Sequence, residues 1–123
     1  MAAKDGNNLR QFVLYSESIK TAVGSEPARY LGVNFAGVPA ANASAVSNVS
    51  RDGSFSAVML GLMPVRVKNG ATIAKGQAVS TDANGHLIPA TALTGILGIA
   101  LEAVTNASDV YIEVFVNTSP VVA

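Results

Sequence analysis

The chain has 123 residues, enough for one domain with a modest core, and its eight basic and eight acidic residues leave no net charge. This balance excludes the basic surface typical of nucleic-acid-binding proteins, and the absence of cysteine excludes disulfides and thiolate metal sites. Because half of the residues are hydrophobic and only 13% are charged, against roughly 25% in typical soluble domains, we expect partner proteins to cover much of the surface.

The first half of the chain is irregular. Residues 9–16 and 30–35 are rich in aromatic and β-favouring side chains, which favours strands. Residues 16–29 have a weak helical pattern, but a glycine and a proline argue against a long helix. Residues 37–54 consist almost wholly of small and turn-forming residues, which predicts a long loop or extended arm before the apolar stretch 55–60.

The second half is a succession of short strands. In residues 63–68, Val65 and Val67 alternate with Arg66 and Lys68, and this period of two is typical of a half-buried strand. The strands that we expect next cover residues 76–81, 86–89, 95–101 and 110–116, with a hairpin loop at 82–85.

Turn signals at this spacing predict an all-β fold, a small β-barrel or sandwich of short strands with an extended, loop-rich N-terminal region. We expect residues 1–60 to be an N-terminal arm or irregular β region, and residues 61–123 to be a compact, barrel-like knob. The polar first residues lack the apolar core of a secretory signal, and no apolar run reaches the ~18–20 residues of a membrane span. We therefore expect synthesis in the cytoplasm and no membrane contact.

Side chains that could carry catalysis are few. His86, the only histidine, follows the hairpin loop, and with Asp82 and a serine it could be written as a triad, although a solvent-facing turn histidine is the simpler interpretation. Asp109 and Glu113 are the nearest pair of carboxylates for glycoside hydrolysis, at a spacing that places them on one face of a strand. We expect no enzyme activity, no bound metal and no cofactor.

Charge is distributed unevenly along the second half. Residues 54–81 contain three basic and no acidic side chains, whereas residues 82–123 contain four acidic and no basic ones. Chance gives such a pattern as readily as complementary pairing between strands or subunits. The contact surface that we expect combines apolar residues near the N-terminus with these charges: Leu9, Phe12, Tyr15, Arg66, Lys68, Glu102 and Glu113.

Four pieces of the second half together resemble the phage capsid cement (head decoration) family over residues 65–116. They are Gly70–Val79 with its Lys-Gly-Gln turn, Asp82–Thr91, Ile96–Glu102 and Val110–Val114. The resemblance implies a barrel-like knob that binds the outside of an assembled icosahedral shell, often as an oligomer, without catalysis or cofactor. The Lys-Gly-Gln turn also occurs in biotinyl and lipoyl carrier domains, but those display a lysine at a hairpin tip where this chain has Ala83, Asn84 and Gly85.

The expected partners are therefore the major capsid protein and further copies of the chain, most simply as a trimer, because closed symmetry covers open strand edges. The expected location is the outer surface of the virion. The alternative is a carbohydrate- or receptor-binding β-module of a phage tail or cell surface, although clustered exposed aromatics would be its signature and the chain has no tryptophan.

Overall fold

The computed structural model describes residues 10–92 and 95–118 and contains eight β-strands. No helix occurs in these two ranges, which confirms the predicted all-β class. The strands are β1 (Phe12–Lys20), β2 (Gly32–Val33), β3 (Ala45–Arg51), β4 (Ser54–Arg66), β5 (Ala78–Thr81), β6 (Leu87–Pro89), β7 (Gly98–Ala100) and β8 (Tyr111–Asn117).

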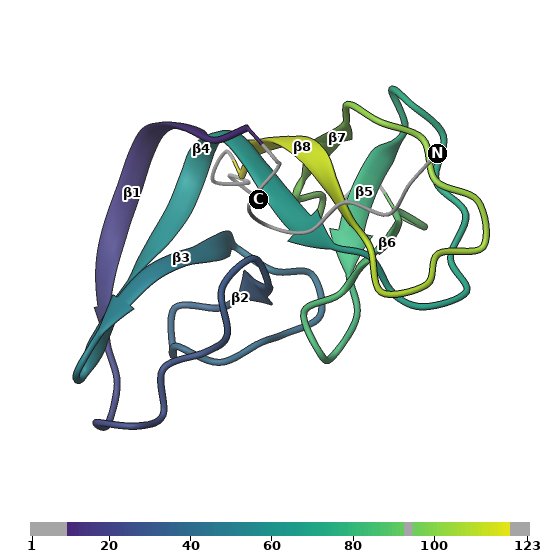
Figure 1. The fold of residues 1–123 in the computed structure, drawn as a ribbon. Helices are drawn as coiled ribbons and strands as arrows, with labels where there is room; N and C mark the ends of the chain where they lie inside the picture. The colour runs from purple at the N-terminus through teal and green to yellow at the C-terminus, as the bar shows by residue number, and fades with distance from the viewer. Residues whose placement is uncertain (1–9, 93–94, 119–123) are drawn as a thin grey trace.

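The strands form one antiparallel sheet in the order β2-β3-β4-β8-β7-β5-β6, with β1 added along β4. Val67, which directly follows the last residue of β4, forms a parallel bridge with Leu87 of β6. This bridge joins the two ends of the series from β4 to β6, so that these strands are nearly closed into a small barrel. Figure 1 shows the barrel on the right and β1, β3 and the first part of β4 extending to the left.

The long strand β4 belongs to both parts of the molecule. β1 pairs along residues 54–62 of β4, β3 pairs along residues 54–58, and β8 pairs along residues 60–66. Gly61, with a φ of 142°, permits the close approach of β1, because a Cβ at this position would overlap the carbonyl oxygen of Phe12. We call β1, β3 and residues 54–58 of β4 the wing.

Two apolar clusters fill the structure. The smaller one lies between the wing and β2 and contains Ile19, Val33, Ala45, Phe55 and Ala57. The larger one fills the barrel and extends to the base of the wing. Its members are Tyr30, Ala43, Val46, Val58, Met63, Val65, Val67, Ile73, Val79, Leu87, Leu97, Ala100, Ala107, Ile112, Val114 and Val116.

The prediction of a long loop or arm over residues 37–54 is wrong in its second part, because residues 45–51 form β3. The neighbours Ala45 and Val46 are both fully buried, and they belong to different clusters. β3 is therefore packed on both faces at its start, where its side chains are small. Small residues that resemble a loop composition are here a consequence of two-sided packing.

Two further expectations for the first half change in the structure. The weak helical pattern of residues 16–29 does not form a helix, because β1 continues to Lys20 and a turn-rich segment follows. The apolar stretch 55–60 and the expected strand 63–68 are one continuous strand of 13 residues.

The division of the chain at residue 60 stays a prediction. β4 runs through this position. Tyr30 and Val46, which precede it, share the larger cluster with Leu87 and Val114, which follow it.

Candidate protein interface

Four apolar side chains form a row across the outer face of the sheet. Phe12 of β1 pairs with Leu62 of β4, which in turn pairs with Phe115 of β8. Phe115 pairs with Ile99 of β7. Directly opposed residues of antiparallel strands point to the same face, and the neighbouring Val114 points into the larger cluster, so these four side chains point outward. We call them the apolar row.

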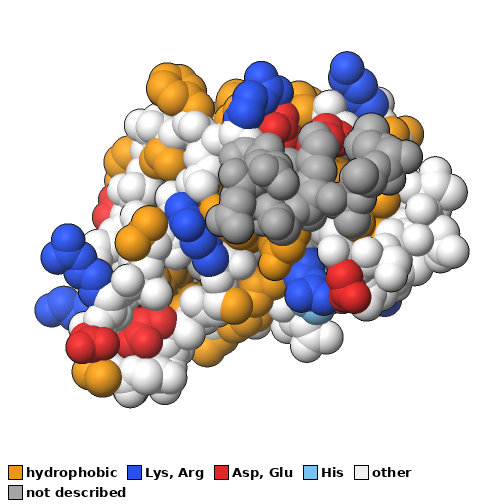
Figure 2. All heavy atoms as spheres, viewed as in Figure 1, with side chains coloured by type: hydrophobic (Ala, Val, Ile, Leu, Met, Phe, Trp, Pro, Cys, Tyr) orange, Lys and Arg blue, Asp and Glu red, His pale blue; other side chains and the backbone are white. Residues whose placement is uncertain are grey.

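The apolar row is substantially open to solvent. Phe12 is 62% exposed, Ile99 46% and Phe115 38%, and Leu62 is half-buried. Figure 2 shows orange apolar side chains among uncharged white ones and scattered blue and red charged ones on the face drawn there. A partner that covers the row would remove four adjacent apolar side chains from water.

An ion pair fixes the chain at the start of the row. The backbone nitrogen and the guanidinium of Arg10 donate hydrogen bonds to the Glu113 carboxylate, with Nη2 and Oε1 2.6 Å apart. Glu113 is buried on β8, and its backbone nitrogen donates to Glu102 Oε1. The hydrogen bond that the Arg10 guanidinium donates to Glu113, and then the negative charge of Glu113, raise the pKa of Arg10 above its ordinary value. Because Phe12 is two residues from Arg10, this pair ties the start of β1 to β8 across β4.

β1 is exposed on both faces in its first half. Phe12, Val13, Leu14 and Tyr15 are all exposed, although successive side chains of a strand point in opposite directions. Within the described residues β1 pairs with β4 alone, so its second edge has no partner strand there. A strand with an open edge and apolar side chains on both faces is a site where another protein chain can bind.

The structure brings some of the expected contact residues together and separates others. Phe12 and Tyr15 lie exposed on β1, whereas Leu9 lies outside the described residues. Arg66 does not meet Glu102 or Glu113, because its Nη2 is 2.7 Å from Asp109 Oδ1 within the chain. Lys68 is exposed, and Glu102 and Glu113 are bonded to each other as described above. Whether these residues contact a partner stays a prediction.

The carboxylates that the sequence offered as catalytic candidates make structural contacts. Asp82 Oδ1 accepts hydrogen bonds from the backbone nitrogens of Asn84 and His86, which closes the predicted hairpin loop. Asp109 and Glu113 bind different arginines.

The described residues contain no group of three or more His, Cys, Asp or Glu that could hold a metal ion. No helix in the described ranges is long and apolar enough to cross a membrane.

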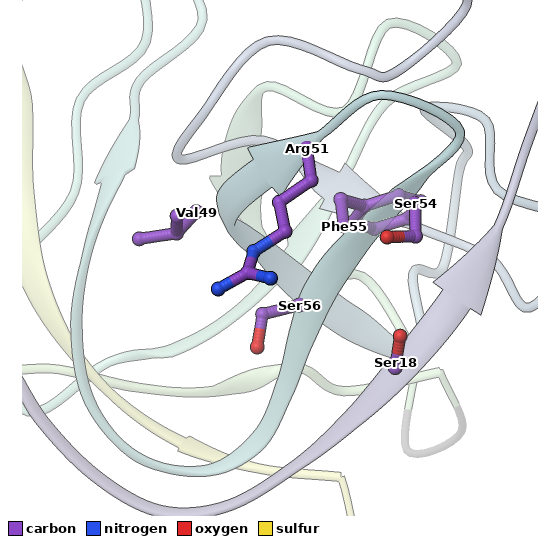
Figure 3. A pocket seen from close by; sticks show the side chains of 6 residues that line it. All are labelled: Ser18, Val49, Arg51, Ser54, Phe55 and Ser56. Carbon is purple, nitrogen blue, oxygen red and sulfur yellow. The ribbon is translucent and has the colours of Figure 1, made fainter. Parts of the chain in front are cut away.

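A pocket of about 230 Å³ lies on the wing, lined by Ser18, Val49, Arg51, Ser54, Phe55 and Ser56 (Figure 3). Its residues come from β1, β3 and β4, and none of them was expected to form a site from the sequence. Most of them fall within or next to the segment predicted as a loop. The lining contains one cation, three hydroxyl groups and no carboxylate.

The turn next to this pocket is tied down by Glu26. Its Oε2 accepts hydrogen bonds from the backbone nitrogens of Gly53, at 2.8 Å, and Gly24, at 3.1 Å. The bond from Gly53 is the largest cause of a pKa of Glu26 that lies below its ordinary value of 4.5. The charged form of Glu26 is therefore the form that the fold favours.

We expect this bond to make stability depend on pH. A carboxyl group whose pKa is lowered by folding stabilises the protein above its unfolded pKa, and this contribution is lost as the pH falls through the lower, folded pKa. Glu26→Gln should therefore lower the melting temperature at pH 7, and the difference from the wild type should shrink below pH 4.5. Thermal unfolding at pH 7 and pH 3 measures it, with Asp52→Asn, an exposed carboxyl of the same turn, as the control. A difference that is equal at both pH values would contradict the assignment.

Comparison with known proteins gives one match. A family model described as phage cement protein matches residues 11–117, a span that includes both the wing and the barrel. No curated protein and no solved structure matches the chain.

Proposed function

Because the chain belongs to the phage cement protein family, we propose that it is a structural decoration protein that binds the outer surface of an assembled phage head and stabilises it. The family implies binding to the phage capsid and a place on the virion. The finer statements are part of the proposal: the partner is the major capsid protein, the bound face is the outside of the shell, and the protein is made in the host cytoplasm. The same family suggests a structural role without catalysis.

The observation that best supports docking is the apolar row together with the exposed first half of β1. Apolar surface removed from water contributes about 25 cal/mol per Å², and large aromatic side chains at the centre of an interface carry much of its binding energy. The row places Phe12 and Phe115 on one face. We assign this face to the shell protein, because the capsid is the partner that the family implies.

We also propose that the protein assembles on the shell as a homo-oligomer, most simply a trimer. The open edge of β1 is one surface that an oligomer would cover. In a closed ring, each copy binds one neighbour through one surface and the other neighbour through a second surface, so that every such edge is covered.

Sedimentation of the purified protein with empty, expanded heads of the phage that encodes it tests the proposal. We expect saturable co-sedimentation and a higher melting temperature of the decorated heads, because a ligand that binds only the assembled state stabilises it. Native mass spectrometry of the free protein measures the oligomer. Absence of binding to heads would overturn the proposed function, and binding to host envelope fractions instead would favour a receptor- or carbohydrate-binding module.

A further inference from the structure

The pocket on the wing combines one cation, Arg51, with three serine hydroxyls, and a second cation, Lys20, lies on the strand across β4 from Arg51. Lys20 of β1 and Arg51 of β3 are both direct Cα partners of Ser54 of β4, so the two cations flank one serine across three strands. In the next register position Ser18 pairs with Ser56. Opposed residues share a face, and these residues therefore point to the same side of the wing.

The side chains that alternate with these serines show which side this is. Phe55 and Ala57 belong to the smaller apolar cluster, so Ser54 and Ser56 point away from it. In Figure 3 the guanidinium of Arg51 reaches along β4 toward Ser56 and Val49. The hydroxyls and the guanidinium thus face one hollow from different strands.

Arg51 differs from the other arginines of the described chain. Arg10 and Arg66 form ion pairs with Glu113 and Asp109, and Arg29 donates a hydrogen bond to Asn48. The side chain of Arg51 has no ion pair or hydrogen bond with any described residue. Asp52 follows it in the chain but does not line the pocket.

This arrangement is suited to a carboxylate. A guanidinium presents a planar set of N–H donors that fits a carboxylate, and serine hydroxyls add further donors. The volume of about 230 Å³ is below the range of about 300–1,000 Å³ typical of small-molecule sites, and it suits a single side chain. We propose that the pocket receives the side chain of an aspartate or glutamate of the shell protein when the decoration protein docks. The inference rests on the proposed function, and it makes the wing a second contact point besides the apolar row.

The test compares the binding of Arg51→Gln and wild-type protein to empty heads at low salt. A hydrogen-bonded charge contact predicts a loss of affinity of at least tenfold for Arg51→Gln and a smaller loss for Lys20→Gln. Lys75→Gln, which removes an exposed cation of the barrel, is the matched control and should bind like the wild type. All variants should melt at nearly the wild-type temperature, because the Arg51 side chain bonds to no described residue and both lysines are exposed.

A charge exchange identifies the partner group. The Arg51→Glu variant should bind heads poorly. Heads in which one surface acid of the shell protein is replaced by lysine should bind this variant again when that acid is the one that occupies the pocket. Wild-type affinity of Arg51→Gln, or an equal loss for Lys75→Gln, would overturn the inference while leaving the proposed function intact. Inorganic phosphate should compete only weakly with heads for binding to the protein at matched ionic strength. Tight phosphate binding, together with normal head binding by Arg51→Gln, would show that the pocket is a site for small anions instead. Failure of the wild type to bind heads would instead reject the proposed function itself.

Discussion

Replacing Phe12 and Phe115 together by serine is expected to reduce the affinity of the protein for empty heads by a factor of about one hundred or more. Truncation of an aromatic side chain at the centre of an interface commonly costs about 2 kcal/mol or more, and each 1.4 kcal/mol corresponds to tenfold in affinity. The two side chains lie in one row but are separated by Leu62, so both are available to a flat partner surface. Because both are substantially exposed, their loss should change the melting temperature little.

The matched control is the double variant Val23→Ser and Phe35→Ser. Both residues are exposed and apolar but lie outside the apolar row: Val23 lies between β1 and β2, and Phe35 follows β2. We expect this variant to bind heads within a factor of a few of the wild type. Sedimentation with a dilution series of each protein gives the affinities. An equal loss of affinity for both double variants would show that general hydrophobicity governs binding. Wild-type affinity of the Phe12 and Phe115 double variant would show that the contact with the head lies outside the apolar row.

Removal of residues 1–53 is expected to abolish cooperative folding. The deletion takes Tyr30 and Val46 out of the larger cluster and removes both β3 and β1 from the edges of β4. It also removes the Tyr30 carbonyl that accepts a hydrogen bond from Arg66. Losing one large buried side chain costs about 2–5 kcal/mol, and the total stability of a small domain is about 5–15 kcal/mol.

Circular dichroism during heating measures this effect. The truncated chain should show no sigmoidal transition, whereas full-length protein with Val46→Ala should still unfold cooperatively at a lower temperature. Independent folding of residues 54–123 would support a compact unit in the second half, and a head-binding assay of that fragment would then show whether the first half carries the adhesive surface.

The second half of the chain could be predicted well because its signals are local. The loop at 82–85 joins β5 and β6 as expected, with Gly85 at a φ of 76° and the Asp82 carboxylate bonded inside the turn. Val110–Val116 overlaps β8 almost entirely, since alternating side chains require only one strand to be recognised.

The first half and the site depend on pairings that are distant in sequence. β3 has small side chains because it is packed from two sides, and neither side is visible in its own residues. Phe12 and Tyr15 could be proposed as contacts from their apolar character, but Leu62, Phe115 and Ile99 join Phe12 only through the strand order β1-β4-β8-β7. The wing pocket likewise exists only because Ser18 of β1 and Arg51 of β3 lie on opposite edges of the same part of β4.

The sharing of β4 between wing and barrel has a mechanical consequence. A pull along β4 acts in shear on its ladders with β1, β3 and β8, so many hydrogen bonds resist it at the same time. A force that peels β1 away from β4 would instead break the hydrogen bonds between these two strands one after another. A protein anchored to a shell at the apolar row and at the wing pocket would therefore transmit tension between the two points along its most resistant direction.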